Sequence, residues 1–564
     1  MNISAIMILL ITALAEASTF TVKAGGGGNY TTIQACATAM AAGDTCIVYA
    51  GTYNENVTVS AGTTGNYKAL TVNGSDVVTV QSFTLNSHTK LIGNCAVPAA
   101  INTCGFNIQN PSSPISATCV GLPNGTTDVY IRNNVMYACG NAAMIGLSGA
   151  GQAVSYVYVQ GNTLSYACIT QAQAGTATKE CNGIFLMGDH VLIEGNDLSH
   201  YTLGIYFTAA SYGIYRNNTI HDQYETEAGG NAHTDGFYAE PALATQHNVI
   251  EGNRQYHGVG PNAKVVLTQG QDAGCNGICF GVIIRYNYAY DFGSSNLSGY
   301  SFPYVKLYNN TYVDLGKECS PCYGSLDVFN QISNPMSYGA SINNIYYFSF
   351  AVPNSGPANP VAFDAASAAT GTWGYSLAYC NATGASNCDL FGHIYEQGTW
   401  AGETGNILGY ANRSPTNNPN FVNLAGHDFH LQSGSPAIGA GTYLTTVAVG
   451  DSGSGTSLVV NDAAYFQDGY GLSNAYSTVS PDCVAVGTAS NHVCVTAVNY
   501  TTNTLTLASS INRSAGQGVY LYSKSDGVQV LTGSAPDMGM EPYTEAGGSA
   551  FSGALTLSGK VTVQ

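Results

Sequence analysis

Acidic and imidazole side chains are sparse in this chain, and several of them recur at one point of a repeated pattern. The 564 residues include 33 Asp and Glu and 11 His. Four residues after a repeated Asn stand His200, Asp222, His257, Asp291 and Asp314. If successive repeats stack, these side chains form one stripe of groups able to donate and accept protons. The acids could instead cap turns at strand ends, and the histidines could serve as stacking residues.

The segment after Asp222, QYETEAGGNAHTDGFYAE, carries a second group of ionisable residues. His233 and Asp235 stand there in a Gly-rich stretch that has no structural need for either residue. Lys264 follows in the next repeat, where it could act as a base or be a solvated strand residue. The predicted catalytic residues are therefore His233, Asp235, Lys264, Asp222 and His257.

Two reactions fit these residue types. In β-elimination on a uronate polymer, a cation neutralises the sugar carboxylate, so that a Lys, Arg, His or Tyr base can take the neighbouring proton. Ca²⁺ is a possible cofactor because it prefers oxygen ligands, and its predicted ligands are Asp222, Glu225, Glu227 and Asp235. In glycoside hydrolysis two carboxylates flank the bond that breaks, and Asp222 and Asp235 are the candidates.

Aromatic side chains in the same region favour a sugar ligand, since sugar rings pack on aromatic faces. Tyr is abundant throughout the chain, with 39 residues. The predicted substrate-binding residues are Tyr238, Tyr256, Arg254 and His200. We expect the partner to be a polysaccharide.

The elements that position these residues follow a repeat built around Asn, as in VYIRNNVMY, VLIEGNDLS and VKLYNNTYV. The repeated residues are Asn134, Asn162, Asn196, Asn218, Asn253, Asn287, Asn310 and Asn344. Their spacings cluster near about 22 and about 34 residues, which indicates a coil of about 22 residues with a loop of about a dozen more inserted in alternate turns. Inward residues flank each Asn with a period of two. We predict an all-β parallel β-solenoid with three faces per coil. Each Asn would take a left-handed conformation at a sharp bend and bond to the Asn above and below it.

Charged residues alternate in sign two positions before the repeated Asn. The column contains Glu194, Arg216, Glu251 and Arg285 on four consecutive coils. Neighbours in such a stack would pair, and surface pairs contribute little stability. We interpret the column as an outward surface feature that fixes the register of the coils.

Motifs at the two ends of the repeat point to a known family. Residues 30–59, YTTIQACATAMAAGDTCIVYAGTYNENVTV, combine helical apolar spacing with a strand and predict a helix that caps the open end of the solenoid. DFHLQSGSPAIGAG and PDMGMEPY, residues 428–441 and 536–543, lie near the other end. With these segments the chain resembles the secreted right-handed parallel β-helix proteins of the pectate-lyase-like superfamily. The resemblance implies a right-handed parallel β-helix with a groove for a long sugar chain, flanked by loops of successive coils.

One short motif resembles a particular branch of that superfamily. HTDG, at residues 233–236, is similar to the NTDG of polygalacturonases. The following coil lacks that family's Asp-Asp pair, and no Gly-His-Gly follows. The resemblance therefore favours the fold over this particular activity.

The chain divides into five predicted segments. Residues 1–17 read as a signal peptide, residues 18–444 as the β-helix and residues 535–543 as its closing motif. Between them, residues 445–534 contain short strands joined by Gly and Asn turns, which predicts a small inserted β-barrel or sandwich. Residues 544–564 read as a flexible tail. We expect the protein to be secreted.

Sixteen Cys residues fall in close pairs, which is typical of a protein from an oxidising compartment. The predicted disulfides are Cys36–Cys46, Cys95–Cys104, Cys119–Cys139, Cys168–Cys181, Cys275–Cys279, Cys380–Cys388 and Cys483–Cys494. Cys319 and Cys322 have the spacing of a redox motif, but their surroundings favour a loop disulfide.

Composition narrows the class of function. A net charge of −18 argues against a nucleic-acid partner, and no apolar run after the signal segment is long enough to span a membrane. We expect an extracellular enzyme that degrades an acidic or plant-type polysaccharide, with lyase chemistry ahead of hydrolysis. The alternative is a non-catalytic surface or adhesion protein that binds glycans, which the small number of Lys and Arg residues favours.

Overall fold

A computed structural model describes most of the chain. The described residues are 16–109, 118–139, 142–147, 153–167, 181–223, 234–240, 246–260, 263–269, 280–294, 297–300, 302–316, 325–330, 338–349, 359–363, 371–381, 405–410 and 414–544. The structural statements below concern these residues.

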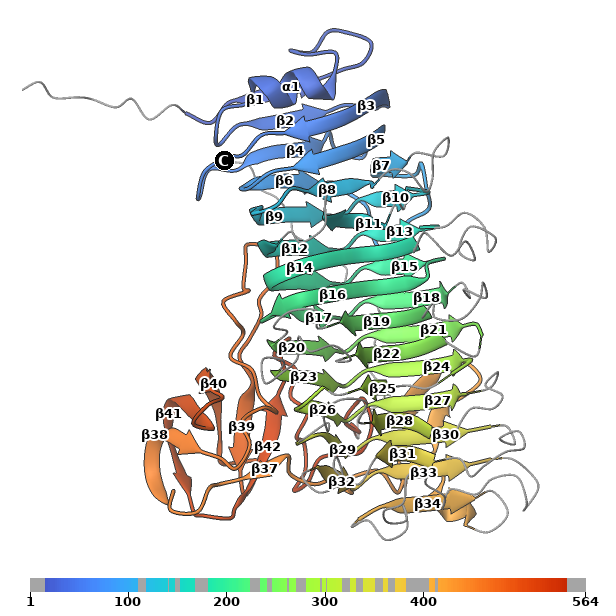
Figure 1. Ribbon diagram of the computed structural model, residues 1–564, viewed down its shortest axis with the longest axis vertical. Helices are drawn as coiled ribbons and strands as arrows, with labels where there is room; N and C mark the ends of the chain where they lie inside the picture. Colours follow the sequence, from blue (N-terminus) through green and yellow to red (C-terminus); the bar gives the residue numbers. More distant parts are fainter. Residues whose placement is uncertain are drawn as a thin grey trace, which may run out of the picture.

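The body of the molecule is a parallel β-helix whose strands stack in three columns, which we call faces A, B and C (Figure 1). Each coil runs along face A, turns at the repeated Asn, continues along face B and then along face C. Adjacent coils pair in parallel and in register, so residues 22 to 35 positions apart become neighbours. This confirms the predicted all-β, right-handed parallel β-helix class and its three faces.

Face A contains the strands that precede the repeated Asn. They are β1 (Thr19–Val22), β2 (Thr45–Val48), β4 (Lys68–Val72), β6 (Thr89–Ile92), β9 (Thr127–Arg132), β12 (Val154–Gln160), the second half of β14 (Cys181–Glu194), β17 (Ile214–Arg216), β20 (Gln246–Glu251), β23 (Phe280–Arg285), β26 (Val305–Tyr308), β29 (Ala340–Ile342) and β32 (Thr372–Gly374).

Face B contains the strands that follow the repeated Asn. They are the first parts of β3 (Gly51–Val59) and β5 (Val77–Leu85), then β7 (Gly105–Gln109), β10 (Val135–Tyr137), β13 (Thr163–Ser165), β15 (Asp197–Ser199), β18 (Thr219–Gln223), β21 (Arg254–Gly258), β24 (Tyr288–Phe292), β27 (Thr311–Leu315), β30 (Ile345–Phe348), β33 (Leu377–Cys380) and β34 (Ile407–Tyr410).

Face C completes each coil. Besides the second parts of β3 and β5 and the first half of β14, its strands are β8 (Val120–Leu122), β11 (Ala142–Leu147), β16 (Leu203–Ser211), β19 (Thr234–Glu240), β22 (Ala263–Gln269), β25 (Leu297–Tyr300), β28 (Ser325–Asn330) and β31 (Asn359–Phe363).

The eight repeated asparagines form one continuous ladder, as predicted. The Asn218 side-chain amide donates to Asn253 Oδ1 at 3.0 Å, and the Asn218 backbone N–H donates to the same oxygen at 2.9 Å. All eight side chains are buried, and Ser376 and Asn406 extend the ladder by two coils. The ladder therefore satisfies polar groups at a bend that lies inside the protein.

The left-handed conformation lies one residue before the ladder Asn, which corrects the predicted position. The positive φ angles belong to residues such as Asn133, Gly195 and Asn217, at 55°, 63° and 55°. The preceding residue makes the bend, and the ladder Asn is left free to turn its amide along the stack.

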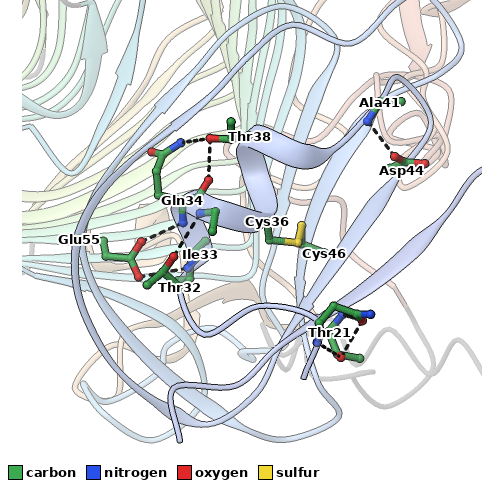
Figure 2. The surroundings of a disulfide bond; sticks show 12 residues. Thr21, Thr32, Ile33, Gln34, Cys36, Thr38, Ala41, Asp44, Cys46 and Glu55 are labelled. Carbon is green, nitrogen blue, oxygen red and sulfur yellow. Dashed lines mark hydrogen bonds between the residues drawn. A yellow bond between two sulfur atoms is a disulfide. The ribbon is translucent and has the colours of Figure 1, made fainter. Parts of the chain in front are cut away.

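A short helix, α1 (Ile33–Ala39), covers the N-terminal end of the β-helix, as predicted (Figure 1). Glu55 accepts hydrogen bonds from the backbone N–H groups of Ile33 and Gln34 at 3.0 and 2.8 Å, which satisfies the helix N-terminus (Figure 2). The Cys36–Cys46 disulfide then ties the helix to β2 (Figure 2).

The C-terminal part of the chain returns along the outside of the solenoid. A short 3₁₀ helix (Pro415–Asn417) leads into the hairpin of β35 (Phe421–Asn423) and β36 (Asp428–Leu431), which packs on the lower coils of face B. Gly441 and Pro536 then lie side by side, with a hydrogen bond of 2.9 Å between the Gly441 N–H and the Pro536 carbonyl.

Between Gly441 and Pro536 the chain forms a separate six-stranded antiparallel sheet, which we call the module. Its strand order is β37 (Thr445–Thr446), β42 (Gly518–Ser523), β39 (Cys483–Val486), β40 (His492–Asn499), β41 (Thr504–Arg513) and β38 (Gly453–Val459). A bridge between Val447 and Val460 joins the two outer strands, so the sheet closes on itself as a small barrel. The module lies beside face A (Figure 1).

The alternating charges of face A are buried beneath the module, which corrects their interpretation as surface register markers. Arg285 pairs with Glu251 and with Asp482 of the module, and all three side chains are at most 1% exposed. Arg216 pairs with Glu194 and donates to the backbone carbonyls of Ser525 and Thr478 in the module. The sequence pattern gave no sign that a module covers this face.

Four predicted disulfides lie wholly within the described residues and are present. They are Cys36–Cys46, Cys95–Cys104, Cys119–Cys139 and Cys483–Cys494. Cys181 and Cys380 are also disulfide-bonded. Their predicted partners, Cys168 and Cys388, lie outside the described residues, as do Cys275, Cys279, Cys319 and Cys322. Among the described helices none is long and apolar enough to cross a membrane.

Candidate functional site

The predicted stripe exists at the corner where face B turns into face C. His200, Asp222, His257, Asp291 and Asp314 all take the left-handed conformation there, with φ between 52° and 60°. His257 Nδ1 lies 3.0 Å from Asp222 Oδ1 on the coil above, and His257 Nε2 lies 3.6 Å from Asp291 Oδ2 on the coil below. The three side chains are 40% to 47% exposed, so the chain Asp222–His257–Asp291 is open to solvent.

His221 extends this chain along face B. Its two ring nitrogens lie 2.7 Å from Asp222 Oδ2 and 3.4 Å from Asp197 Oδ1. Burial alone would lower the pKa of His221, but hydrogen bonds and charges from Asp197 and then Asp222 outweigh burial and raise it. Burial correspondingly favours a higher pKa for Asp222, and the hydrogen bonds from His221 and His257 reverse this and lower it. The carboxylate of Asp222 is therefore held ionised between two imidazoles.

An arginine and stacked tyrosines lie beside the chain on face B. The Arg254 guanidinium lies 4.8 Å from the Tyr256 ring centre and donates to the Tyr290 hydroxyl at 2.8 Å. Tyr256 stacks between His221 and Tyr290, with ring centres 4.8 and 5.1 Å apart. Arg254 makes no ion pair with a carboxylate of the described residues, so its charge is available to an anionic ligand.

The hairpin of β35 and β36 bounds this surface on the side of the lower coils. His427, in the hairpin turn, stacks on Tyr290 with ring centres 4.0 Å apart. Phe429 packs edge-on against Tyr288 and Tyr290. The chain Asp222–His257–Asp291 thus lies next to the part of face B on which the hairpin packs.

His200, a predicted substrate-binding residue, occupies the same corner one coil above Asp222. Its ring stacks on Tyr166 at 3.9 Å, and its backbone N–H donates to the Asp222 carbonyl at 3.1 Å. Burial lowers the pKa of His200, so its imidazole is neutral at physiological pH.

The remaining predicted residues lie around the corner, on face C. Asp235 and Lys264 are direct neighbours in register on β19 and β22, and both are buried. Tyr238 belongs to a stacked row on this face, 4.8 Å from Tyr206. Burial raises the pKa of the Tyr201 hydroxyl, and the charges of Asp222 on face B and Asp235 on face C raise it further. The predicted site is therefore one region divided by a corner.

The predicted Ca²⁺ site is not assembled by the described residues. Glu225, Glu227 and the catalytic candidate His233 lie outside them, and both oxygens of Asp222 are occupied by imidazoles. The described part of the chain contains no group of three His, Cys, Asp or Glu side chains placed to hold a metal.

Sequence reasoning missed His221 and Asp197. They stand three and one residues after the ladder Asn, at the outward positions of face B. The signal was present, because aligning the repeats at these two offsets places Asp197, His221, Arg254 and Tyr256 on one surface.

Comparison with known proteins gives likeness of structure only. No family model and no curated protein matches the chain. Among solved structures, the pectate lyase Pel9A is 14% identical, with a TM-score of 0.35, over 78% of this chain and 95% of its own. A lacto-N-biosidase of family GH136 from Eubacterium ramulus is 10% identical, with a TM-score of 0.37, over 70% and 68%. An alginate lyase from Paenibacillus sp. is 13% identical, with a TM-score of 0.30, over 70% and 98%.

Proposed function

We propose that the protein is a secreted enzyme that cleaves an acidic polysaccharide by β-elimination at the corner between faces B and C. The observation that carries the proposal is the solvent-open chain Asp222–His257–Asp291 beside Arg254, whose charge pairs with no carboxylate of the described residues. It supplies a proton acceptor and a cation for the sugar carboxylate within one surface. The four disulfides within the described residues, together with the disulfide-bonded Cys181 and Cys380, fit an oxidising, extracellular setting.

In this proposal the Arg254 guanidinium binds the uronate carboxylate and makes the neighbouring carbon acid stronger. Nδ1–H of His257 donates to Asp222, which fixes the tautomer, so Nε2 takes the proton, and the carboxylate of Asp291, 3.6 Å away, stabilises the imidazolium that forms. The C–H bond breaks, its electrons form the ring double bond, and the bond to the glycosidic oxygen breaks. Water supplies the proton that the leaving oxygen needs. Asp222 positions the base, and Tyr256 offers an aromatic edge to the sugar.

Asp235 and Lys264 have a supporting role in this proposal, on the face C side of the same corner. Both side chains are buried, so in this proposal they act on the polymer through their charges from beneath the corner and do not contact it. Ca²⁺ stays a candidate cofactor, tested by the chelator arm of the experiment below, and the ligands would include the acids that follow Asp222 in the sequence.

The test is cleavage of a panel of acidic and neutral polysaccharides, monitored by ultraviolet absorbance of the new carbon–carbon double bond and by reducing ends. We expect absorbance to rise with an acidic polymer, and His257→Ala to lower kcat by at least about 100-fold. His492→Ala is the matched control, because His492 lies exposed on the module.

Reducing ends without absorbance would show hydrolysis, and glycan binding without cleavage would show the adhesion function. Either result would overturn the proposal. Parallel assays with and without a chelator test the Ca²⁺ requirement.

A further inference from the structure

Two cations on the upper coils of face A, the partly buried Lys90 and the buried Arg132, lack carboxylate partners among the described residues. Lys90 and Arg132 make no hydrogen bond or ion pair with the residues that the structure describes. Further down the same face, each buried cation has a partner within 2.7 Å: Arg216 has Glu194, Arg285 has Asp482 and Lys306 has Asp462. The difference marks Lys90 and Arg132 as charges that the described part of the chain does not pair with a carboxylate.

The register of the strands places the two cations on one surface. Lys90 on β6 is paired with Tyr130 on β9, and Arg132 lies two residues further along the same side of β9. The Lys90 ammonium lies 4.0 Å from the ring centre of Tyr67 and 5.0 Å from that of Tyr130. The walls around both charges are thus tyrosine rings.

The module closes this surface with one aromatic side chain. Tyr476 lies over the Arg132 guanidinium at 3.9 Å and over the Lys90 ammonium at 5.7 Å. A loop of the module extends upward along the solenoid toward this position (Figure 1). Arg132 is 7% exposed, and its Nε is buried without a hydrogen-bond partner among the described residues.

The nearest carboxylates are already engaged. Glu194, whose charge acts on Arg132, pairs with Arg216 at 2.6 Å and accepts from Gln160 at 2.9 Å. Asp128, whose charge acts on Lys90, accepts from the Tyr67 hydroxyl at 2.6 Å and lies 3.1 Å from His88. Neither acid is free to neutralise the two cations.

We propose that Lys90 and Arg132, enclosed by Tyr67, Tyr130 and Tyr476, form a second anion-binding site for the carboxylate of an acidic sugar. This inference rests on the proposed function, because it assigns an acidic glycan as the ligand. The guanidinium supplies a planar pair of donors for a carboxylate, and the ammonium supplies a second charge on the neighbouring coil. The tyrosine walls exclude water and strengthen the attraction. The site anchors the polymer at the seam between the solenoid and the module, on a different face from the corner.

The test measures binding of a uronate trisaccharide by calorimetry to the Arg254→Met/His257→Ala protein, in which the corner cannot bind or cleave. We expect this protein to bind the trisaccharide, and Lys90→Met or Arg132→Met added to it to weaken binding by about tenfold each. Arg132→Lys keeps the charge and should weaken binding less than Arg132→Met. Lys23→Met is the matched control, because Lys23 lies 4.3 Å from the Tyr49 ring at the N-terminal end and should leave binding unchanged.

Unchanged affinity in folded Lys90→Met and Arg132→Met proteins would overturn the inference. Equal binding of the carboxyl-reduced, neutral trisaccharide would also overturn it, since the carboxylate would then not be recognised. Inorganic sulfate that binds as tightly as the trisaccharide would contradict the assignment to a sugar. Cleavage by the unmodified protein is measured separately. The Lys90 variant could lose trisaccharide binding while the unmodified protein cleaves no polymer. That combination would support the second anion-binding site and reject the proposed reaction.

Discussion

Arg285 of the solenoid and Asp482 of the module form a two-point ion pair, with both nitrogen–oxygen distances at 2.7 Å. The two residues are separated by 197 positions in the chain and are completely buried. Glu251 supplies a second carboxylate to Arg285 at 2.6 Å, and Ser525 donates to Glu251 from the module at 2.6 Å. The contact between solenoid and module is therefore a polar network enclosed by apolar side chains, and its charges depend on one another.

Removing one member of this network should strongly destabilise the protein. Asp482→Asn leaves the charge of Arg285 short of a partner in a buried site, and we expect the free energy of unfolding to fall by about 3–5 kcal/mol. Denaturant unfolding followed by circular dichroism measures the change. Asp189→Asn is the control, because Asp189 is half-exposed beside His190, and its loss should cost less than about 1 kcal/mol. Equal effects of the two substitutions would contradict the prediction.

The Asn ladder should respond to removal of a single amide. Asn253 accepts from the backbone N–H and the side-chain amide of Asn218, and it donates to the Tyr215 carbonyl at 2.9 Å. Asn253→Ala leaves these groups buried without partners, which should lower the free energy of unfolding by about 2–4 kcal/mol. Thermal unfolding measures it against Asn512→Ala, whose side chain is exposed on the module. A ladder variant as stable as the control would show that the stacked amides add nothing.

Asp222 should affect turnover more than substrate binding. In our proposal it orients His257 through the 3.0 Å contact and does not touch the sugar. Asp222→Asn should therefore lower kcat by about 10- to 100-fold with little change in KM. Steady-state kinetics on the acidic polymer identified in the cleavage assay provide the measurement. A rise in KM at unchanged kcat would assign Asp222 to substrate binding instead.

The closing segment, residues 536–543, should become less stably folded as the pH rises above neutral. A hydrogen bond to Glu541, assisted by Asp428, raises the pKa of His430 to about 9. A raised pKa means that the contact stabilises the fold fully below the ordinary histidine pKa of about 6.5 and that this contribution disappears as the pH rises through about 9. Hydrogen exchange of residues 536–543 should therefore accelerate between pH 7 and 10 beyond its intrinsic pH dependence. In His430→Gln the extra acceleration should be absent, and its persistence would assign the effect to another group.

Much of the fold could be predicted because it is periodic. Asn196, Asn218 and Asn253 repeat in the sequence at the spacing of one coil, so residues at equal offsets from them had to become neighbours. That argument alone places Asp222 next to His257, and it would have placed His221 next to Tyr256 had the outward offsets been aligned as well. Because the coils stack in register, the position of a residue within its repeat determines which distant residues become its neighbours.

The contacts that break the period could not be predicted in this way. Arg216 and Arg285 look like surface charges in the repeat, and only the docked module, whose Asp482 lies nearly 200 residues downstream, makes them buried. Arg132 belongs to the same column as Arg216 and Arg285 and differs in having no carboxylate partner among the described residues, which no repeat pattern encodes. The separation of Asp222, at the end of face B, from Asp235, on face C, could not be predicted either, because the sequence does not show where a strand ends and the next face begins.

The bond between Gly441 and Pro536 brings together the two points at which the module leaves and rejoins the solenoid. A barrel whose two connections to the solenoid lie side by side can be gained, lost or exchanged over evolution, with little disturbance to the winding of the coils. Here the exchange is constrained, because any replacement would have to supply carboxylates to the arginines of face A that Asp482 and its neighbours now neutralise. Relatives without the module should therefore carry uncharged residues at positions 216 and 285.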